Sequence, residues 1–233
     1  MECKNQRGRS MIEMLGVLAI IGVLSVAGIA GYAKAMIKWK INKTVEMVEQ
    51  ITYNILTLYT NQKTLGFTNS VSSVAELKNL GIIPENLAPY SNDTYHFVNP
   101  LGGISYIYLN NTLFEIYISD ISKEACIALS TFHWDFNSPY FVGLAAVNRT
   151  GNNPVASYCM NIIDATEGRY FSDEHLFACK CARTTTPEFG LPVPPDIAAQ
   201  ACSCKSDVCE FTIAHSLTGI EDPETCGKDF DWD

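Results

Sequence analysis

The nine cysteines are the side chains of this sequence with the most obvious capacity for chemistry. Cys3 stands before a long apolar segment, and the other eight follow it: Cys126, Cys159, Cys179, Cys181, Cys202, Cys204, Cys209 and Cys226. An even number of cysteines on one side of an apolar segment is typical of a disulfide framework in an oxidising compartment.

Zinc binding is the alternative use of these thiols, because two C-x-C pairs each have a histidine nearby. They are Cys179 and Cys181 with His175, and Cys202 and Cys204 with His215. Zinc ligands more often come as C-x-x-C pairs, and zinc thiolates suit the cytosol better than an export compartment. We therefore predict disulfides and no metal.

Glu13 is the second residue with a chemical role to explain. It directly precedes residues 14–33, a run of twenty residues without a charge. An acid at the centre of a membrane helix costs on the order of 2.5–3.5 kcal/mol on insertion scales, so an acid at the helix edge should have a positive partner. Arg9 stands four residues earlier, at the i, i+4 spacing that lets it pair with Glu13 within one helix.

The remaining polar residues form no recognisable catalytic or cofactor motif. The four histidines belong to no nucleophile, metal or phosphate signature: His96, His133, His175 and His215. The acidic end, Asp229-Phe-Asp231-Trp-Asp233, could hold calcium, but calcium needs six or more oxygens, so we interpret it as a solvated tail. We expect no enzymatic activity and no cofactor.

Charge excludes one class of partner for the distal part of the chain. From Thr44 onward there are 9 basic against 23 acidic residues, a net charge of −14 by that difference. Such a surface repels phosphate backbones, so we expect this distal part, the head of the molecule, not to bind nucleic acid.

Glu13 and the apolar run belong to a predicted helix whose character changes along its length. Residues 14–33 would form a helix about 30 Å long, enough to cross a bilayer. Lysines and arginines lie on both sides of the run, so they do not decide its orientation in the membrane. The eight cysteines after the run instead indicate that the larger part of the chain, which follows the run, lies on the outer side of the membrane. Apolar residues then recur every three or four positions from Ile37 to Leu58, which predicts one helix from about Ser10 to about Thr60.

The rest of the chain predicts short mixed elements. Ser73 and Ser122 are candidate helix N-caps, residues 104–109 and 113–118 flank Asn110-Asn111 as a hairpin, and residues 140–147 and 208–214 are further strands. Residues 148–195 are rich in Asn, Thr, Gly and Pro, which predicts a long loop held by cysteines. The fold class is therefore α+β, with an antiparallel sheet packed on the amphipathic half of the first helix.

Residues 8–24, GRSMIEMLGVLAIIGVL, resemble the processing motif of type IV prepilins and type II secretion pseudopilins. In that family a glycine is followed by a glutamate and then by an unbroken apolar helix. The resemblance implies that a prepilin peptidase cuts after Gly8 and that Arg9 becomes an N-methylated terminus. It also implies that Glu13 neutralises the new amine of an adjacent subunit during assembly.

The resemblance extends to the heads of type IVb pilins through several short segments in the family's order. They are LGIIP at 80–84, NPLGGI at 99–104, FEIYI at 114–118, EACIAL at 124–129 and LPVPPDIAAQAC at 191–202. It implies a disulfide between Cys126 and Cys202. Cys179 and Cys181 need different partners, which stay open among Cys159, Cys204, Cys209 and Cys226.

We therefore predict that the chain has three parts. They are a leader at 1–8, a transmembrane and assembly segment at 9–35, and an amphipathic half-helix with a disulfide-bonded pilin head at 36–233. The resemblance implies an inner-membrane precursor that becomes a subunit of an extracellular filament. Its partners would be identical subunits, prepilin peptidase, the inner-membrane assembly machinery and, before assembly, the lipid bilayer. A minor pilin or pseudopilin, or a membrane-anchored binding module that does not assemble, is the alternative.

Overall fold

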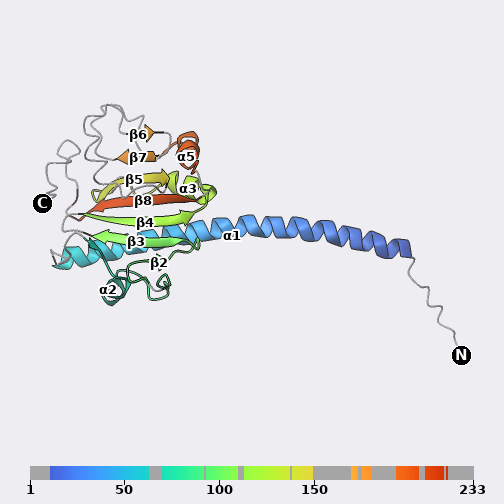
Figure 1. Cartoon of the computed structure of the whole chain (residues 1–233), viewed down its shortest axis with the longest axis horizontal. Helices are drawn as coiled ribbons and strands as arrows, with labels where there is room; N and C mark the ends of the chain where they lie inside the picture. The colour runs from blue at the N-terminus through green and yellow to red at the C-terminus, as the bar shows by residue number, and fades with distance from the viewer. Residues whose placement is uncertain are drawn as a thin grey trace. The chain divides into compact units, whose positions relative to one another are not determined.

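The first helix spans both parts of the chain. A computed structural model describes residues 11–62, 70–91, 93–109, 113–136, 138–148, 169–172, 175–179, 193–204, 208–217 and 219. Helix α1, Met11–Gln62, runs for 52 residues without interruption, which confirms the predicted single helix (Figure 1). The chain divides into two compact units, Met1–Lys40 and Ile41–Asp233, so α1 belongs to both.

The two halves of α1 differ in burial. From Met11 to Ala35 every side chain is exposed, whereas from Ile41 on one face is buried. The buried face consists chiefly of apolar residues at steps of three or four: Ile41, Val45, Val48, Ile51 and Ile55. This spacing keeps them on one side of the helix. Burial of that stripe holds the second half of α1 in the head.

The head contains one antiparallel sheet. Its strands are β1 Ser70–Val71, β2 Phe97–Val98, β3 Ile104–Leu109, β4 Leu113–Ile121, β5 Phe141–Asn148, β6 Arg169–Ser172, β7 His175–Cys179 and β8 Cys209–Ser216. The order is β1-β3-β4-β8-β5-β7-β6, with β2 also paired to β3 (Figure 1). With the helices, this order gives the predicted α+β class. The late strand β8 sits between β4 and β5, so long-range contacts hold the centre of the sheet.

Two short helices begin at the predicted serine caps. Ser73 Oγ accepts a hydrogen bond from the Glu76 N–H at the start of α2, Val74–Asn79. Ser122 Oγ accepts one from the Ala125 N–H at the start of α3, Lys123–Ser130. A third helix, α5 Pro195–Ala201, begins after Pro194 without a side-chain cap.

The Asn99–Gly103 turn leads directly into β3. Asn99 Oδ1 accepts hydrogen bonds from the N–H groups of Leu101 and Gly103, and Gly102 has φ +95°, which favours glycine. Gly103 is needed for space, because a Cβ there would lie 2.7 Å from the Asp120 carbonyl oxygen. Asp120 has φ +58° and lies where the β4 register shifts, so this glycine accommodates a β-bulge.

The prediction for residues 148–195 was wrong in part. Strands β6 and β7 lie within that segment and extend the sheet beyond β5, where Gly143 to Val147 pair with β7. The polar composition of the surrounding segment hid these two short strands, of which β6 lies at the edge of the sheet. Strand β7 is extended beside β5, and β6 is extended beside β7.

Candidate functional site

The exposed apolar half of α1 is the most distinctive surface of the chain. Within the part that the structure describes, α1 is the one helix long and apolar enough to cross a membrane. Its large apolar side chains from Met11 to Ile29 are between 52% and 83% exposed. A soluble domain rarely leaves so much contiguous apolar surface uncovered, so this surface needs lipid or protein as a partner.

Glu13 lies in the first turn of this apolar helix, with its side chain exposed. A carboxylate is favoured there by the partial positive charge of the helix N-terminus. Gly8 and Arg9, the predicted cleavage pair, lie outside the described residues. The structure therefore places the acid of the predicted assembly site at the start of the exposed helix.

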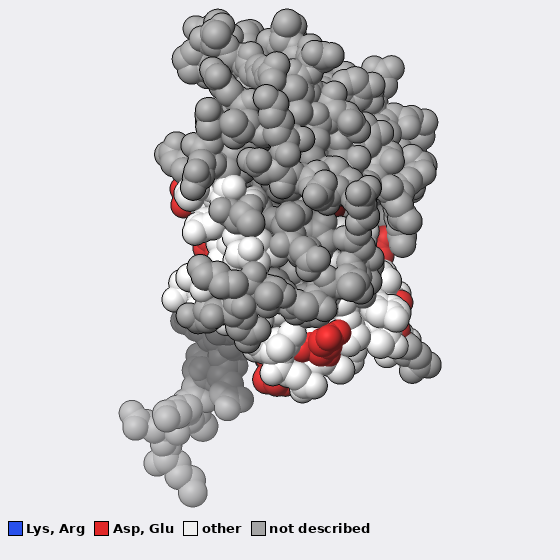
Figure 2. All heavy atoms as spheres, turned by 90° about the vertical axis from the view of Figure 1, so that its left-hand side faces the viewer, with Lys and Arg blue, Asp and Glu red and all other residues white. Residues whose placement is uncertain are grey.

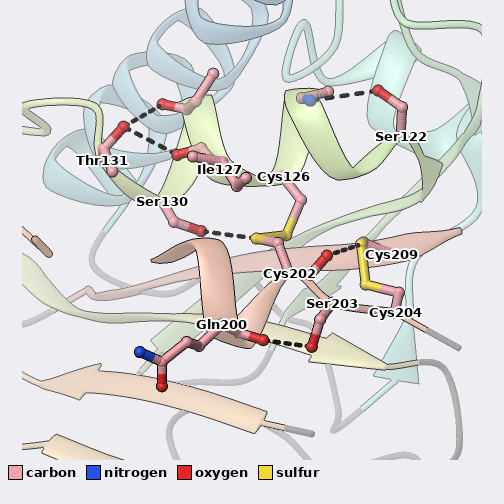
Figure 3. The surroundings of a disulfide bond; sticks show 12 residues. Ser122, Cys126, Ile127, Ser130, Thr131, Gln200, Cys202, Ser203, Cys204 and Cys209 are labelled. Carbon is pink, nitrogen blue, oxygen red and sulfur yellow. Dashed lines mark hydrogen bonds between the residues drawn. A yellow bond between two sulfur atoms is a disulfide. The ribbon is translucent and has the colours of Figure 1, made fainter. Parts of the chain in front are cut away.

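A disulfide joins Cys126 on α3 to Cys202 directly after α5, with the two Cα atoms 5.8 Å apart (Figure 3). This is the pair that the pilin resemblance implies. Ser130 lies on the same side of α3, with its Oγ 3.9 Å from Cys202 Sγ, and it is the donor because a disulfide sulfur carries no proton. All three side chains are fully buried, so the bond ties two helices together inside the head.

A second disulfide joins Cys204 to Cys209, with the Cα atoms 5.5 Å apart. It closes the short connection between α5 and β8, and Cys209 Sγ lies 3.5 Å from the Cys202 carbonyl oxygen (Figure 3). The four cysteines therefore form one buried cluster at the junction of α3, α5 and β8. Because Cys204 and Cys209 are bonded to each other, neither is the partner of Cys179 or Cys181 that the sequence left open.

The cysteine cluster also bears on whether these cysteines bind zinc instead of forming disulfides. The sulfur atoms of Cys126, Cys204 and Cys209 lie within 4.8 Å of one another, a grouping that could hold a metal ion. Both disulfides use these sulfurs, and a metal would need the free thiolates. His215 is not in this group. Cys159, Cys181 and Cys226 lie outside the described residues, and of Cys179 only its place at the end of β7 is described.

Sequence reasoning missed a buried polar group on β4. Glu115 is fully buried and accepts a hydrogen bond from the Tyr117 hydroxyl, while Ser119 donates to Glu210 of β8 at 2.5 Å. Burial, followed by the negative charge of Glu115, raises the pKa of Tyr117 far above its ordinary range. The signal was available, because Glu115, Tyr117 and Ser119 alternate along one face of the strand.

His215 is buried in an aromatic setting rather than in a metal site. Its ring stacks on Phe114 at 5.1 Å between centroids and meets the edge of Phe141 at 5.7 Å. Burial lowers the pKa of His215 from 6.5 to about 3, because the interior penalises the charged form. It is therefore a neutral core residue at ordinary pH.

The surface charge agrees with the acidic composition. On the face shown in Figure 2, the described surface carries Asp and Glu side chains, and no Lys or Arg is visible on it. Among the described head residues, Asp93 accepts hydrogen bonds from the N–H groups of Tyr95 and His96, and the Tyr95 bond is the main cause that lowers its pKa. The described part of this face therefore presents acidic side chains.

Comparisons with known proteins do not add an assignment. No protein-family model matches the sequence, and no curated protein sequence matches it significantly.

Proposed function

We propose that this chain is a subunit of a type IV pilus-like extracellular filament. It would be held in the inner membrane as a precursor, cut by prepilin peptidase after Gly8 and assembled through its N-terminal helix. One observation carries the proposal: a single uninterrupted helix presents an exposed apolar half and then contributes a buried stripe to a disulfide-bonded head. A filament subunit needs both properties, because one half must pack with other helices and the other must hold the head.

Two ordinary explanations of an apolar N-terminal helix fit less well. The core helix of a soluble protein is mostly buried, whereas the most apolar part of α1 is exposed along its whole length. A secretory signal peptide is removed after its apolar segment. Removal there would cut α1 in its middle, where the same helix continues into the head.

Glu13 supplies the assembly chemistry in this proposal. While the precursor lies in the bilayer, the carboxylate at the edge of the span is costly unless a positive charge approaches it. Cleavage after Gly8 creates an amine at Arg9, and the amine of an adjacent subunit can pair with Glu13. Such pairing sets the axial offset between neighbouring helices, since the two charged groups must meet at one depth.

The disulfides support an exported head. Cys126–Cys202 and Cys204–Cys209 are bonded and buried, and disulfides persist in oxidising compartments such as the periplasm and the cell exterior. They would keep the head folded when the subunit leaves the membrane, because a covalent cross-link limits the unfolded chain.

The first experiment is an intact-mass measurement of the protein isolated from its native membranes, beside a Gly8→Val variant. We expect the wild-type mass to correspond to a chain that begins at Arg9, with one methyl group added, and the variant to keep residues 1–8. A wild-type chain that keeps these residues would favour a membrane-anchored module that does not assemble.

The second experiment separates assembly from folding. Glu13→Ala should abolish surface filaments while the head still contains the Cys126–Cys202 bond in a peptide map. Glu49→Ala is the matched control, because Glu49 is an exposed acid on the same helix but lies in the head. Filaments at wild-type yield from Glu13→Ala would refute the proposed mechanism, and loss of the folded head would assign Glu13 an earlier role.

A further inference from the structure

The segment of α1 that follows the apolar run carries two exposed aromatic side chains. Tyr32 is 67% exposed and Trp39 is 53% exposed. They are seven residues apart, about 20° short of two full helical turns, so they lie on one side of the helix. Ile41, the first fully packed residue of α1, is about 200° away from Trp39, so the aromatic pair does not belong to the buried stripe.

Lysines surround this aromatic pair. Lys34 is the first charged residue after the apolar run, and Lys38 and Lys40 stand about 100° to either side of Trp39. Farther along the helix, Lys43 is paired with Glu46 at 2.5 Å. The segment 32–40 therefore combines amphipathic rings with three positive charges and no acid. This is the composition of a bilayer–water interface, where tyrosine and tryptophan settle at headgroup level.

The axial spacing brings the Trp39 indole within reach of the headgroup layer. If the hydrocarbon ends near Tyr32 and Ala33, the Trp39 Cα lies about 10 Å farther along the axis, about 2–5 Å beyond a headgroup layer that is roughly 5–8 Å thick. Side chains on a helix lean toward its N-terminus, which here brings the indole back toward the bilayer. The indole ring can thus lie in the interface with its N–H toward polar lipid groups.

We propose that Tyr32 and Trp39, with Lys34, Lys38 and Lys40, form an interfacial anchor that binds the headgroup region of an anionic phospholipid bilayer. The anchor fixes the depth of the precursor in the membrane before assembly. This inference rests on the membrane-spanning part of the proposed function. Lipid is the favoured partner over a second subunit because three positive charges around an exposed indole complement phosphate groups, whereas identical chains would bring the lysines of one copy toward those of another.

The test measures depth by fluorescence quenching of the full chain in vesicles of phosphatidylcholine and phosphatidylglycerol at about 3:1, a composition chosen to supply anionic headgroups. Lipids carry bromine either near the carbonyl end or near the middle of the acyl chain. The contribution of Trp39 is the difference between wild type and Trp39→Phe, since the other two tryptophans, Trp134 and Trp232, are common to both. We expect shallow bromines to quench this contribution at least about twofold more than deep ones.

A reporter at mid-span keeps the outcomes distinct. Leu24→Trp in a Trp39→Phe background should be quenched most by deep bromines, because Leu24 lies near the middle of the apolar run. If this reporter is quenched but Trp39 emits as in water, the anchor is refuted while the span stands. If the reporter is also unquenched, the spanning helix itself fails. Protection of Trp39 that arises only in assembled filaments would overturn the lipid assignment in favour of a second copy.

Discussion

The two described disulfides should contribute very different amounts to the stability of the head. Cys126 and Cys202 are separated by 76 residues, whereas Cys204 and Cys209 are separated by 5. On the loop-entropy model, a cross-link limits the unfolded chain more when its loop is longer, which gives about 4.5 kcal/mol for the long loop and about 2.2 kcal/mol for the short one. Removing the first pair should therefore cost about 2 kcal/mol more than removing the second.

The perturbation is a pair of double variants, Cys126→Ala/Cys202→Ala and Cys204→Ala/Cys209→Ala. Each removes two buried sulfur atoms and leaves no unpaired thiol in the cluster, so the lost packing is similar and the loop length is the main difference. The free energy of unfolding is measured by urea titration of the full chain in detergent. Trp134 reports on the cluster region, because its indole N–H donates to the Leu129 carbonyl of α3 at 2.9 Å and it is buried.

The comparison has a clear refuting outcome. If the Cys204–Cys209 variant loses as much stability as the Cys126–Cys202 variant, or more, loop entropy does not set the contribution of these bonds. The local link between α5 and β8 would then matter more than the long-range link from α3. Unchanged stability in both variants would show that neither bond constrains the unfolded chain.

Three further changes test other parts of the head by the same titration. Gly103→Ala should destabilise it by about 1–3 kcal/mol or more, because the added Cβ would press against the Ser119 and Asp120 carbonyl oxygens, while Gly28→Ala on the exposed helix leaves the head unchanged. The free energy of unfolding should fall by about 2 kcal/mol between pH 7.5 and 5, because His215 becomes protonated over that range in the unfolded chain but not in the folded one. The decline should be smaller in His215→Phe. An equal decline in the wild type and in this variant would exclude His215 as its source. Ser122→Ala should lower the free energy of unfolding by about 1 kcal/mol, because the N-cap of α3 is lost. Ser122→Asp should keep most of the wild-type stability, since aspartate also caps helices. Equal stability of the wild type and the two variants would contradict the capping role.

Local patterns predicted the elements whose causes lie within a few residues. The helix caps at Ser73 and Ser122 were predicted correctly, because a serine side chain binds a backbone N–H only three residues away. The pairing of β3 with β4 was also predicted correctly, because an Asn-Asn pair between two apolar runs favours a hairpin. The length of α1 was also predictable from its apolar spacing. The roles of Gly8, Arg9 and Glu13 remain predictions, since they depend on cleavage and on neighbouring subunits.

Elements that depend on distant partners were predicted less well. Strands β6 and β7 were taken as loop because their own residues carry a weak pattern. Strand β7 pairs with β5, which precedes it by many residues, and β6 pairs with β7. The burial of Glu115 was missed for a different reason. A glutamate in a strand usually faces water, and the hydroxyl of Tyr117 on the same face helps to make its burial tolerable.

By itself the sequence determined the division of α1 into an exposed apolar half and an amphipathic half, because hydrophobic spacing is a property of a single helix. Apart from Cys126–Cys202, which the resemblance implied, only the tertiary structure decided which cysteines meet and which polar residues are buried. Cys202 and Cys204 lie two residues apart, yet they bond to Cys126 and Cys209, because a disulfide requires side chains to approach in space rather than in sequence. The position of β8 between β4 and β5 brings these distant segments together.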